Sequence, residues 1–292
     1  MNLYDIKTIK QIMSIYGLTF RKEFGQNFLT DKFVVEDIAE FCCEGRSKNI
    51  LEIGPGIGTL TYELAARYEK VLAVELDKGL IPVLAFTLGE YNNVKIINDD
   101  IMKCDIAEIT APYLKGGLSV CANLPYYITT PILMALLESN VPFDYITVMV
   151  QAEVADRLCA APGSRDCGAI TAVLAYYGTA ERLMKVPAGK FLPPPKVDSA
   201  VIRIKLHKDK PYNPKNEEIF FRTVRAAFGQ RRKTLPNALA AGFGELTRPT
   251  ITEAVIAAGL DANIRGERLT MPEFVALSDK LTELIAEVKT DA

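Results

Sequence analysis

The residues best suited to chemistry form one short run, Asn123-Leu-Pro-Tyr126, which follows the apolar segment 118–122. The side-chain oxygen of Asn123 and a backbone carbonyl near Pro125 are two acceptors that match the two hydrogens of an aromatic amine, such as the exocyclic amine of adenine. Binding both hydrogens draws the nitrogen toward tetrahedral geometry and aims its lone pair at an electrophile. Pro125 fixes φ and helps to hold such a carbonyl, and Tyr126 offers a ring for stacking an extruded base. The alternative is an ordinary strand-end turn.

A glycine-rich turn lies upstream, in the run Glu52-Ile-Gly-Pro-Gly-Ile-Gly58. Gly54, Gly56 and Gly58 are spaced by two, and glycine allows both positive φ and the close approach of a ligand to the backbone. A dinucleotide fingerprint has its third glycine one position later. The Glu-x-Gly-x-Gly-x-Gly form resembles motif I of the S-adenosylmethionine (SAM) methyltransferases. A tight strand-to-helix turn without a ligand is the alternative.

Acidic residues end the next two apolar segments. Glu75 follows the segment 71–74, and a carboxylate at that strand tip can accept hydrogen bonds from both hydroxyls of a ribose. Asp100 follows 94–97 and can accept from an adenine amino group. Both SAM and NAD carry such a ribose, so Glu75 indicates a nucleoside without choosing between them. The alternatives are a surface acid at Glu75 and a helix cap at Asp100.

These residues need a sheet to position them. Apolar runs separated by helical patterns predict strands at 50–53, 71–74, 94–97, 118–122, 145–150 and 183–186. Thr59 is expected to cap the helix after the glycines. Strands alternating with helices predict a Rossmann-like α/β fold, a mainly parallel, doubly wound sheet.

The pattern changes near residue 208. The segment 208–215 holds two prolines and is mostly polar, which is typical of a linker. Beyond it only helical patterns occur, at 217–227, 234–240, 250–258 and 272–288. We therefore predict a catalytic domain at 1–207, with an N-terminal helical segment, and a small all-α domain at 208–292.

Composition excludes several classes of protein. The 292 residues are 49% hydrophobic and 24% charged, and no apolar run approaches the roughly 18 residues of a membrane span. Asp5, Lys7 and Lys10 stand where a signal peptide needs an apolar core, so we expect a cytoplasmic protein. Six cysteines without Cys-x-x-Cys spacing and one histidine argue against a zinc site.

Charge is distributed unevenly. The net charge of −2 argues against a nucleic-acid binder. The segment 201–235, however, holds ten Lys or Arg against three acids, a net +7 that leaves −9 on the rest. This basic segment favours a phosphate-contacting face; an ordinary solvated face is the alternative.

Six motifs in order resemble the KsgA/RsmA family, the small-subunit (16S) rRNA adenine N6-dimethyltransferases, over nearly the whole chain. The two outer motifs separate this family best from generic methyltransferases. The motifs are Phe24–Leu29, Leu51–Thr61, Val74–Asp77, Asn123–Tyr127, Phe191–Ser199 and Phe228–Leu235.

The resemblance implies roles for individual residues. The residues implied to contact SAM are Asn27, Leu29, Gly54, Gly56, Glu75, Asp100 and Asn123. Asn123, Leu124, Pro125 and Tyr126 would hold the target adenine, with Phe191 on its other side. The residues expected to contact rRNA phosphates are Arg222, Arg225, Arg231, Arg232 and Lys233.

The resemblance also implies a substrate. The family adds two methyl groups to each of two adjacent adenosines in a hairpin near the 3′ end of 16S rRNA, on a late 30S assembly intermediate. No zipper pattern is present, so a monomer is expected. The open alternatives are an Erm-like methyltransferase of large-subunit rRNA and an assembly checkpoint whose main role is binding. A DNA adenine methyltransferase is a weaker third, because its usual Asp-Pro-Pro-Tyr run is absent.

Overall fold

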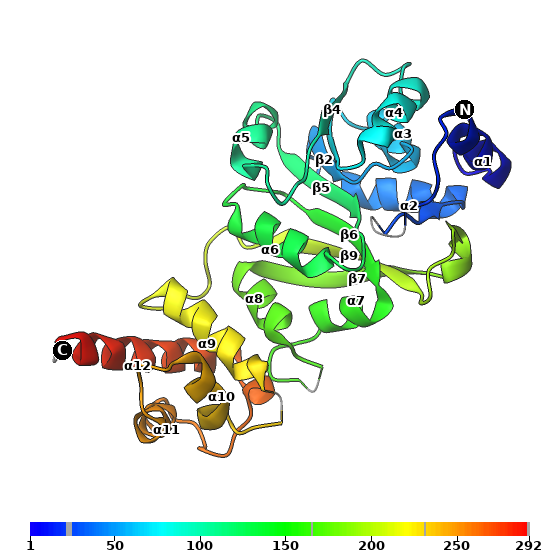
Figure 1. The fold of residues 1–292 in the computed structure, drawn as a ribbon. Helices are drawn as coiled ribbons and strands as arrows, with labels where there is room; N and C mark the ends of the chain where they lie inside the picture. Colours follow the sequence, from blue (N-terminus) through cyan, green and yellow to red (C-terminus); the bar gives the residue numbers. More distant parts are fainter. Residues whose placement is uncertain (22–24, 165, 231, 291–292) are drawn as a thin grey trace. The chain divides into compact units, whose positions relative to one another are not determined.

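The computed structural model describes residues 1–21, 25–164, 166–230 and 232–290 (Figure 1). The chain divides into two compact units, Met1–Ala155 with Ala180–Leu206, and Asp156–Thr179 with His207–Ala292. The boundary predicted after residue 207 lies one residue from a border between these units. The segment 156–179 differs from the prediction, because it groups with the C-terminal helices.

The first unit is built on a seven-stranded sheet in the order β4-β3-β2-β5-β6-β9-β7. Strand β2 pairs in parallel with β3 on one side and with β5 on the other, and β9 pairs antiparallel with β6. The Rossmann-like α/β sheet predicted from the sequence is confirmed. The strands are β2 (Asn49–Ile53), β3 (Lys70–Glu75), β4 (Val94–Asn98), β5 (Leu118–Asn123), β6 (Ile146–Gln151), β7 (Gly178–Val186) and β9 (Ser199–Leu206).

The helices between the strands cover the central strands of the sheet. Every residue of β2 is buried, as an apolar run flanked by parallel neighbours requires. One core cluster joins Ile38 and Leu64 of the helices to Ile50 and Val71 of the strands. The helices that precede or connect the strands are α1 (Ile6–Ile15), α2 (Lys32–Cys43), α3 (Thr59–Ala65), α4 (Ile81–Thr87), α5 (Ile106–Thr110), α6 (Thr129–Glu138) and α7 (Ala152–Leu158).

The start of α3 differs from the prediction. Gly58, with φ +88°, is the residue before the helix, and its missing side chain makes no cap. Thr59 is the first helical residue, and its hydroxyl donates to the Leu3 carbonyl at 3.4 Å. Helix α2 has a side-chain cap, because the Asp31 side chain accepts from the Val34 N–H at 3.2 Å.

A second, two-stranded ladder was not predicted. Strand β1 (Phe28–Leu29) pairs antiparallel with β8 (Phe191–Leu192), so that Leu29 lies opposite Phe191. Two-residue strands give no periodic signal in a sequence. The ladder joins the N-terminal segment to a stretch about 160 residues further along the chain.

The second unit is helical. It contains α8 (Ala169–Tyr177), α9 (Glu217–Gly229), α10 (Leu235–Gly242), α11 (Arg248–Ala257) and α12 (Met271–Thr290). The ring centroid of Tyr176 lies 5.0 Å from that of Phe220 and 5.2 Å from that of Phe221, which ties α8 to α9 and explains why 156–179 belongs here. None of the helices within the described ranges is long and apolar enough to cross a membrane. Short 3-10 turns occupy Lys78–Leu80, Ala111–Tyr113, Ala188–Lys190 and Gly266–Arg268.

Candidate active site

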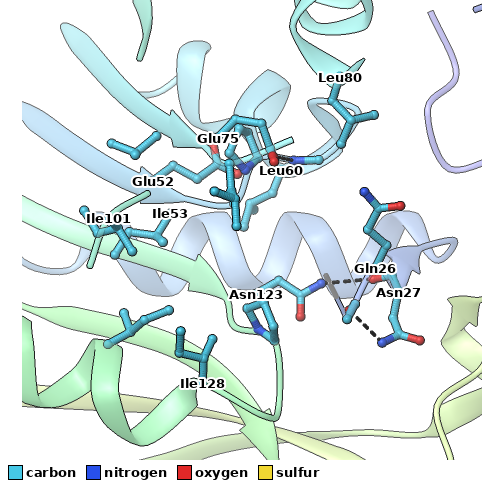
Figure 2. Close-up of a pocket in the computed structure, with 18 of the residues that line it drawn as sticks. Gln26, Asn27, Glu52, Ile53, Leu60, Glu75, Leu80, Ile101, Asn123 and Ile128 are labelled. Atoms are coloured by element: carbon cyan, nitrogen blue, oxygen red, sulfur yellow. Dashed lines mark hydrogen bonds between the residues drawn. The ribbon is translucent and has the colours of Figure 1, made fainter. Parts of the chain in front are cut away.

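A pocket of the first unit lies at the carboxyl ends of β2, β3 and β5 (Figure 2). The strand order reverses between β2 and β5, which is where open α/β sheets bind ligands. The empty space measures about 1010 Å³ with the open solvent at its mouth included. Four stretches supply its walls: 25–29, the glycine turn, the tips of β3 and β4, and the chain after β5.

The glycine turn presents bare backbone to the pocket. Gly54 has φ +71°, and no heavy atom of the described residues lies within 4 Å of a Cβ built on it. Gly56 has φ +62°, and a Cβ there would meet the Phe28 ring at 3.0 Å. Glycine at 54 therefore leaves room for a ligand, whereas glycine at 56 lets the N-terminal segment pack against the turn.

Glu75 is buried at the tip of β3, with 6% of its surface exposed. Its Oε2 accepts from the Gly56 N–H at 3.0 Å and its Oε1 from the Asp77 N–H at 2.7 Å. Burial raises the pKa of Glu75 above its ordinary value, and these backbone N–H groups oppose the rise. A carboxylate has further lone pairs, so the same oxygens can accept from two ligand hydroxyls.

Glu52 lines the same pocket from inside β2. It is 2% exposed, and its Oε2 has no hydrogen-bond partner in the part of the chain that the structure describes. Burial raises the pKa of Glu52 to about 8, and the charge of Glu75 adds to the rise. A buried charge without a partner is costly, and the raised pKa means that the folded protein keeps this carboxyl group protonated at neutral pH.

Asp100 lines the pocket beyond the tip of β4. Its Oδ1 accepts from the Met102 N–H at 3.0 Å, which fixes the carboxylate in the turn. The buried side chain of Ile101 lines the pocket next to it. An acceptor beside an apolar wall suits the amino group and the ring of an adenine.

Asn123 stands at the end of β5, and Figure 2 shows its amide directed at the backbone of Asn27. Its Nδ2 donates to the Asn27 carbonyl at 3.1 Å, so Oδ1 is left as the acceptor of this amide. The Pro125 carbonyl already accepts from the Ile128 N–H and the Thr129 hydroxyl, each at 3.1 Å. The Leu124 carbonyl is therefore the candidate for the second acceptor that the Asn-Leu-Pro-Tyr run is expected to supply.

Three residues expected at the target base do not line this pocket. Leu124 is 1% exposed. Phe191 is 4% exposed and belongs to the core cluster that contains Leu29. Tyr126 is partly buried, and its hydroxyl shares a 2.6 Å hydrogen bond with Ser199.

The other expected residues do meet there. The pocket brings together Asn27, Leu29, Gly54, Gly56, Glu75, Asp100, Asn123 and Pro125. Among the other residues of the lining are Gly25, Gln26 and Tyr127, for which the sequence analysis predicted no role. Gly25 has φ +61°, and a Cβ on it would lie 2.9 Å from the Pro125 Cβ. The glycine inside the Phe24–Leu29 motif was the available signal, but a positive φ and a close approach cannot be read from one sequence.

The basic segment is less uniform than its net charge indicates. Arg203 of the first unit pairs with Glu44 and Glu181. In the second unit, Lys210 pairs with Glu217 and Lys215 pairs with Glu283. These cations neutralise acids of the protein itself, which reduces the charge left for a partner.

The five expected phosphate contacts also differ from one another. The Arg222 guanidinium forms two hydrogen bonds with Glu245, at 2.6 and 2.7 Å, and its Cζ lies 4.3 Å from the centre of the Phe243 ring. Arg225, Arg232 and Lys233 are exposed. Arg231 lies outside the described residues.

The fold and the pocket define a class of protein. The sheet is an open α/β sheet, with exposed glycine backbone beside the carboxylate at the end of β3 and an Asn-Leu-Pro-Tyr run at the end of β5. This combination is typical of methyltransferases that act on nucleic-acid bases.

The match to known proteins narrows this class. The family described as ribosomal RNA adenine dimethylase matches residues 17–282, and this chain belongs to that family. SAM is the methyl donor of the family, and ribosomal RNA is its substrate. The exposed backbone at Gly54 and the Glu75 carboxylate fit a ligand that carries a ribose.

Individual relatives agree with this assignment. Ribosomal RNA small subunit methyltransferase A of Lachnoclostridium phytofermentans is 48% identical over 285 residues, which cover 96% of this chain and 98% of that protein. The protein of the same name from Clostridioides difficile is 46% identical over 92% of this chain and 93% of its own length. Among solved structures, the 23S rRNA methyltransferase ErmE has a TM-score of 0.65 at 25% identity, covering 88% of this chain and all of its own. A dimethyladenosine transferase from Plasmodium falciparum has a TM-score of 0.69 at 22% identity, covering 89% and 98%, and shows the same fold.

Proposed function

We propose that this protein dimethylates the N6 atoms of two adjacent adenosines in a hairpin near the 3′ end of 16S rRNA, on a late 30S assembly intermediate in the cytoplasm. The observation that carries the chemistry is the Asn123 amide, whose Nδ2 is held by the Asn27 carbonyl so that Oδ1 is the acceptor presented to the substrate. The names of the relatives at 46% and 48% identity support the small subunit as the target.

The chain's own groups prepare the amine. Bound SAM supplies an electrophilic methyl group. Asn123 Oδ1 and the Leu124 carbonyl accept the two N6 hydrogens, which takes the nitrogen lone pair out of the adenine ring and points it at the pocket. The leaving thioether is good and the displaced proton can pass to water, so the reaction needs no dedicated base. Alignment of this kind accounts for roughly 7–11 kcal/mol in oriented reactions.

The donor is proposed to bind along the pocket wall. Glu75 accepts from its ribose hydroxyls, and Asp100 from its adenine amino group beside Ile101. Gly54 and Gly56 let the molecule approach the backbone, while Asn27 and Leu29 close the opposite side. Glu52 lines the same wall from inside β2.

The target adenine is proposed to bind against the Asn123–Tyr126 run, with Phe191 on the other side of the base. The structure adds one aromatic candidate, because Tyr127 lines the pocket and is 60% exposed. Tyr126 is tied to Ser199 through its hydroxyl. We therefore assign the accessible stacking surface to Tyr127 and a supporting position to Tyr126.

Docking to rRNA is proposed to use Arg225, Arg232 and Lys233, with Arg231 beside them in the chain. Arg222 contributes less, since its guanidinium is already paired with Glu245. A protein of net charge −2 has little attraction for RNA in general. Binding then depends on this local cluster and on the shape of the subunit, with the protein acting as a monomer.

The direct test is methyl transfer from labelled SAM to two substrates that lack their adenine methylations. One is the small subunit and the other is large-subunit rRNA, and the labelled positions are mapped by mass spectrometry. We expect two dimethyladenosines near the 3′ end of 16S rRNA. Label confined to large-subunit rRNA would instead assign the Erm-like activity.

A binding role in assembly is the second candidate. The exposed cations Arg225, Arg232 and Lys233 belong to the second unit, whereas all the residues that line the pocket belong to the first. Binding and chemistry can therefore be separated by substitution. Glu75→Ala is expected to abolish methylation and to keep binding to immature subunits. If this variant restores subunit maturation in a deletion strain, binding is the main function.

A further inference from the structure

The N-terminal segment reaches the pocket through one buried carboxylate. Asp77 follows β3 by two residues, is 3% exposed and lies outside the set of residues that line the pocket. Its Oδ1 accepts from the Arg21 Nη1 at 3.2 Å, and its Oδ2 accepts from the Gln26 Nε2 at 2.9 Å. The two donors come from a part of the chain more than fifty residues away.

The Gln26 amide completes a closed set of hydrogen bonds. Its Nε2 donates to Asp77, while its Oε1 accepts from the Arg21 backbone N–H at 2.9 Å. The two ends of this amide are therefore distinguished, because one faces an acceptor and the other a donor. Turning this amide over would set its NH2 group against the Arg21 N–H and its oxygen against the Asp77 carboxylate.

The same carboxylate is fixed on its other side by β3 and the turn after it. Asp77 Oδ1 also accepts from the Gly79 N–H at 3.0 Å, and the Asp77 N–H donates to Glu75 Oε1 at 2.7 Å. Asp77 is thus hydrogen-bonded both to the residue assigned to the ribose and to the segment that forms the opposite wall. Gln26, which this set of bonds holds, lines the pocket, and so does Asn27, the next residue in the chain.

We propose that Asp77 is a positioning residue for SAM, which holds Gln26, and with it the wall 25–27, at the distance from Glu75 that the donor requires. The inference rests on the proposed cofactor site and adds to it a residue that touches no ligand. Loss of the hydrogen bond between Asp77 and Gln26 would change no residue that lines the pocket, but it would leave the wall 25–27 without this restraint. Affinity for SAM then falls, because the wall must be ordered by the ligand itself.

An exchange of donor and acceptor tests this directly. Asp77→Asn places an amide NH2 against the Gln26 NH2, and Gln26→Glu places a second carboxylate against Asp77. Each single substitution is expected to raise the Kd for SAM at least about tenfold, the effect of losing one charge-assisted bond. Combining the two substitutions restores one donor facing one acceptor, with Oε1 still available to Arg21, and should return the Kd to within about threefold of the native value.

The measurement is calorimetric titration of SAM, with the thermal unfolding midpoint of each variant alongside. Asp105→Asn is the matched control, because Asp105 also accepts a backbone N–H, from Glu108 at 3.0 Å, but lies away from the pocket. Native affinity in Asp77→Asn or Gln26→Glu would overturn the proposal. So would a double variant that folds like the native protein and binds as weakly as the singles.

A further variant separates failure of this inference from failure of the site. Glu75→Gln removes a proposed ribose acceptor and should weaken SAM binding whatever Asp77 does. If Glu75→Gln weakens SAM binding while Asp77→Asn and Gln26→Glu bind SAM like the native protein, the positioning role of Asp77 is rejected and the pocket assignment stands. Native binding in Glu75→Gln as well would reject the pocket assignment itself.

Discussion

The Asn123 amide is asymmetric in its surroundings, and the proposed chemistry depends on that asymmetry. Its Nδ2 donates to the Asn27 carbonyl at 3.1 Å, which leaves the oxygen as the acceptor proposed to bind the target amine. A side chain of the same size with a different hydrogen-bonding pattern would lose this direction. The residue thus has one bond that orients it and one that serves the substrate.

Two substitutions at Asn123 separate the presence of the side-chain acceptor from its orientation. Asn123→Ala removes the acceptor and is expected to lower the rate of methyl transfer at saturating SAM by about 100-fold or more, the size of a lost transition-state hydrogen bond. Asn123→Asp keeps an acceptor but sets a carboxylate against the Asn27 carbonyl, so it should also be slow. Single-turnover transfer to unmethylated small subunits measures both rates. Native rates in either variant would contradict the role of the amide.

Glu52 gives a stability prediction with a definite sign. Burial raises its pKa from the ordinary 4.5 to about 8, so the folded protein holds a proton that the unfolded chain has released. Stability from this group is therefore complete below about pH 4.5 and is lost as the pH rises toward 8. Glu52→Gln cannot titrate. In urea unfolding, the free energy of unfolding of the variant should rise relative to that of the native protein, by up to about 1.4 kcal/mol for each pH unit between pH 5.5 and 7.5. A pH-independent difference would mean that Glu52 is ionised in the folded protein.

At the scale of elements, the segment 25–29 closes the pocket only because its first residue is glycine. A Cβ on Gly25 would lie 2.9 Å from the Pro125 Cβ and 3.6 Å from the Tyr127 ring. A side chain at position 25 would therefore press against the chain after β5. The pocket is formed by contact between elements that are about 100 residues apart.

A matched pair of glycines tests this contact. Gly25 and Gly17 both have φ +61°, but no heavy atom of the described residues lies within 4 Å of a Cβ on Gly17. Alanine costs about 1–2 kcal/mol of backbone strain at either position. Only Gly25→Ala should also weaken SAM binding and slow methyl transfer, because only there does the new methyl group displace a pocket wall. Equal losses of SAM affinity in the two variants would show that strain alone is responsible.

The sequence predicted most of the sheet and part of the pocket. Apolar runs placed β2, β3, β4 and β5, and the residues at their tips followed from where those runs end. It could not place Phe191 in the core or tie Tyr126 to Ser199, since both depend on β8 and β9 lying against distant elements. Glu52 was noted for its spacing, but its missing partner is a property of packing.

At the scale of the molecule, chemistry and docking are assigned to different units of the chain. The pocket belongs to the first unit, and the exposed cations Arg225, Arg232 and Lys233 belong to the second. Arg203, Lys215 and Arg222 of the segment 201–235, whose net charge is +7, pair with acids that lie outside the segment. Local charge, rather than net charge, is what the proposed docking requires.

Salt dependence of subunit binding tests that view. Arg232→Ala and Lys233→Ala should each reduce the slope of log K against log salt by about one, as expected for a lost phosphate contact. Lys215→Ala is the control, because it removes the same charge from a residue that pairs with Glu283. Its slope should stay close to the native value. A change as large in Lys215→Ala would show that overall charge governs binding.

The central claim is that this pocket dimethylates small-subunit adenosines through Asn123. The most direct measurement is nucleoside mass spectrometry of 16S rRNA from small subunits incubated with SAM and either the native protein or Asn123→Ala. We expect two N6,N6-dimethyladenosines for each subunit with the native protein, and almost none with the variant in the same time. Absence of dimethyladenosine with the native protein, or its formation at the native rate with Asn123→Ala, would contradict the claim.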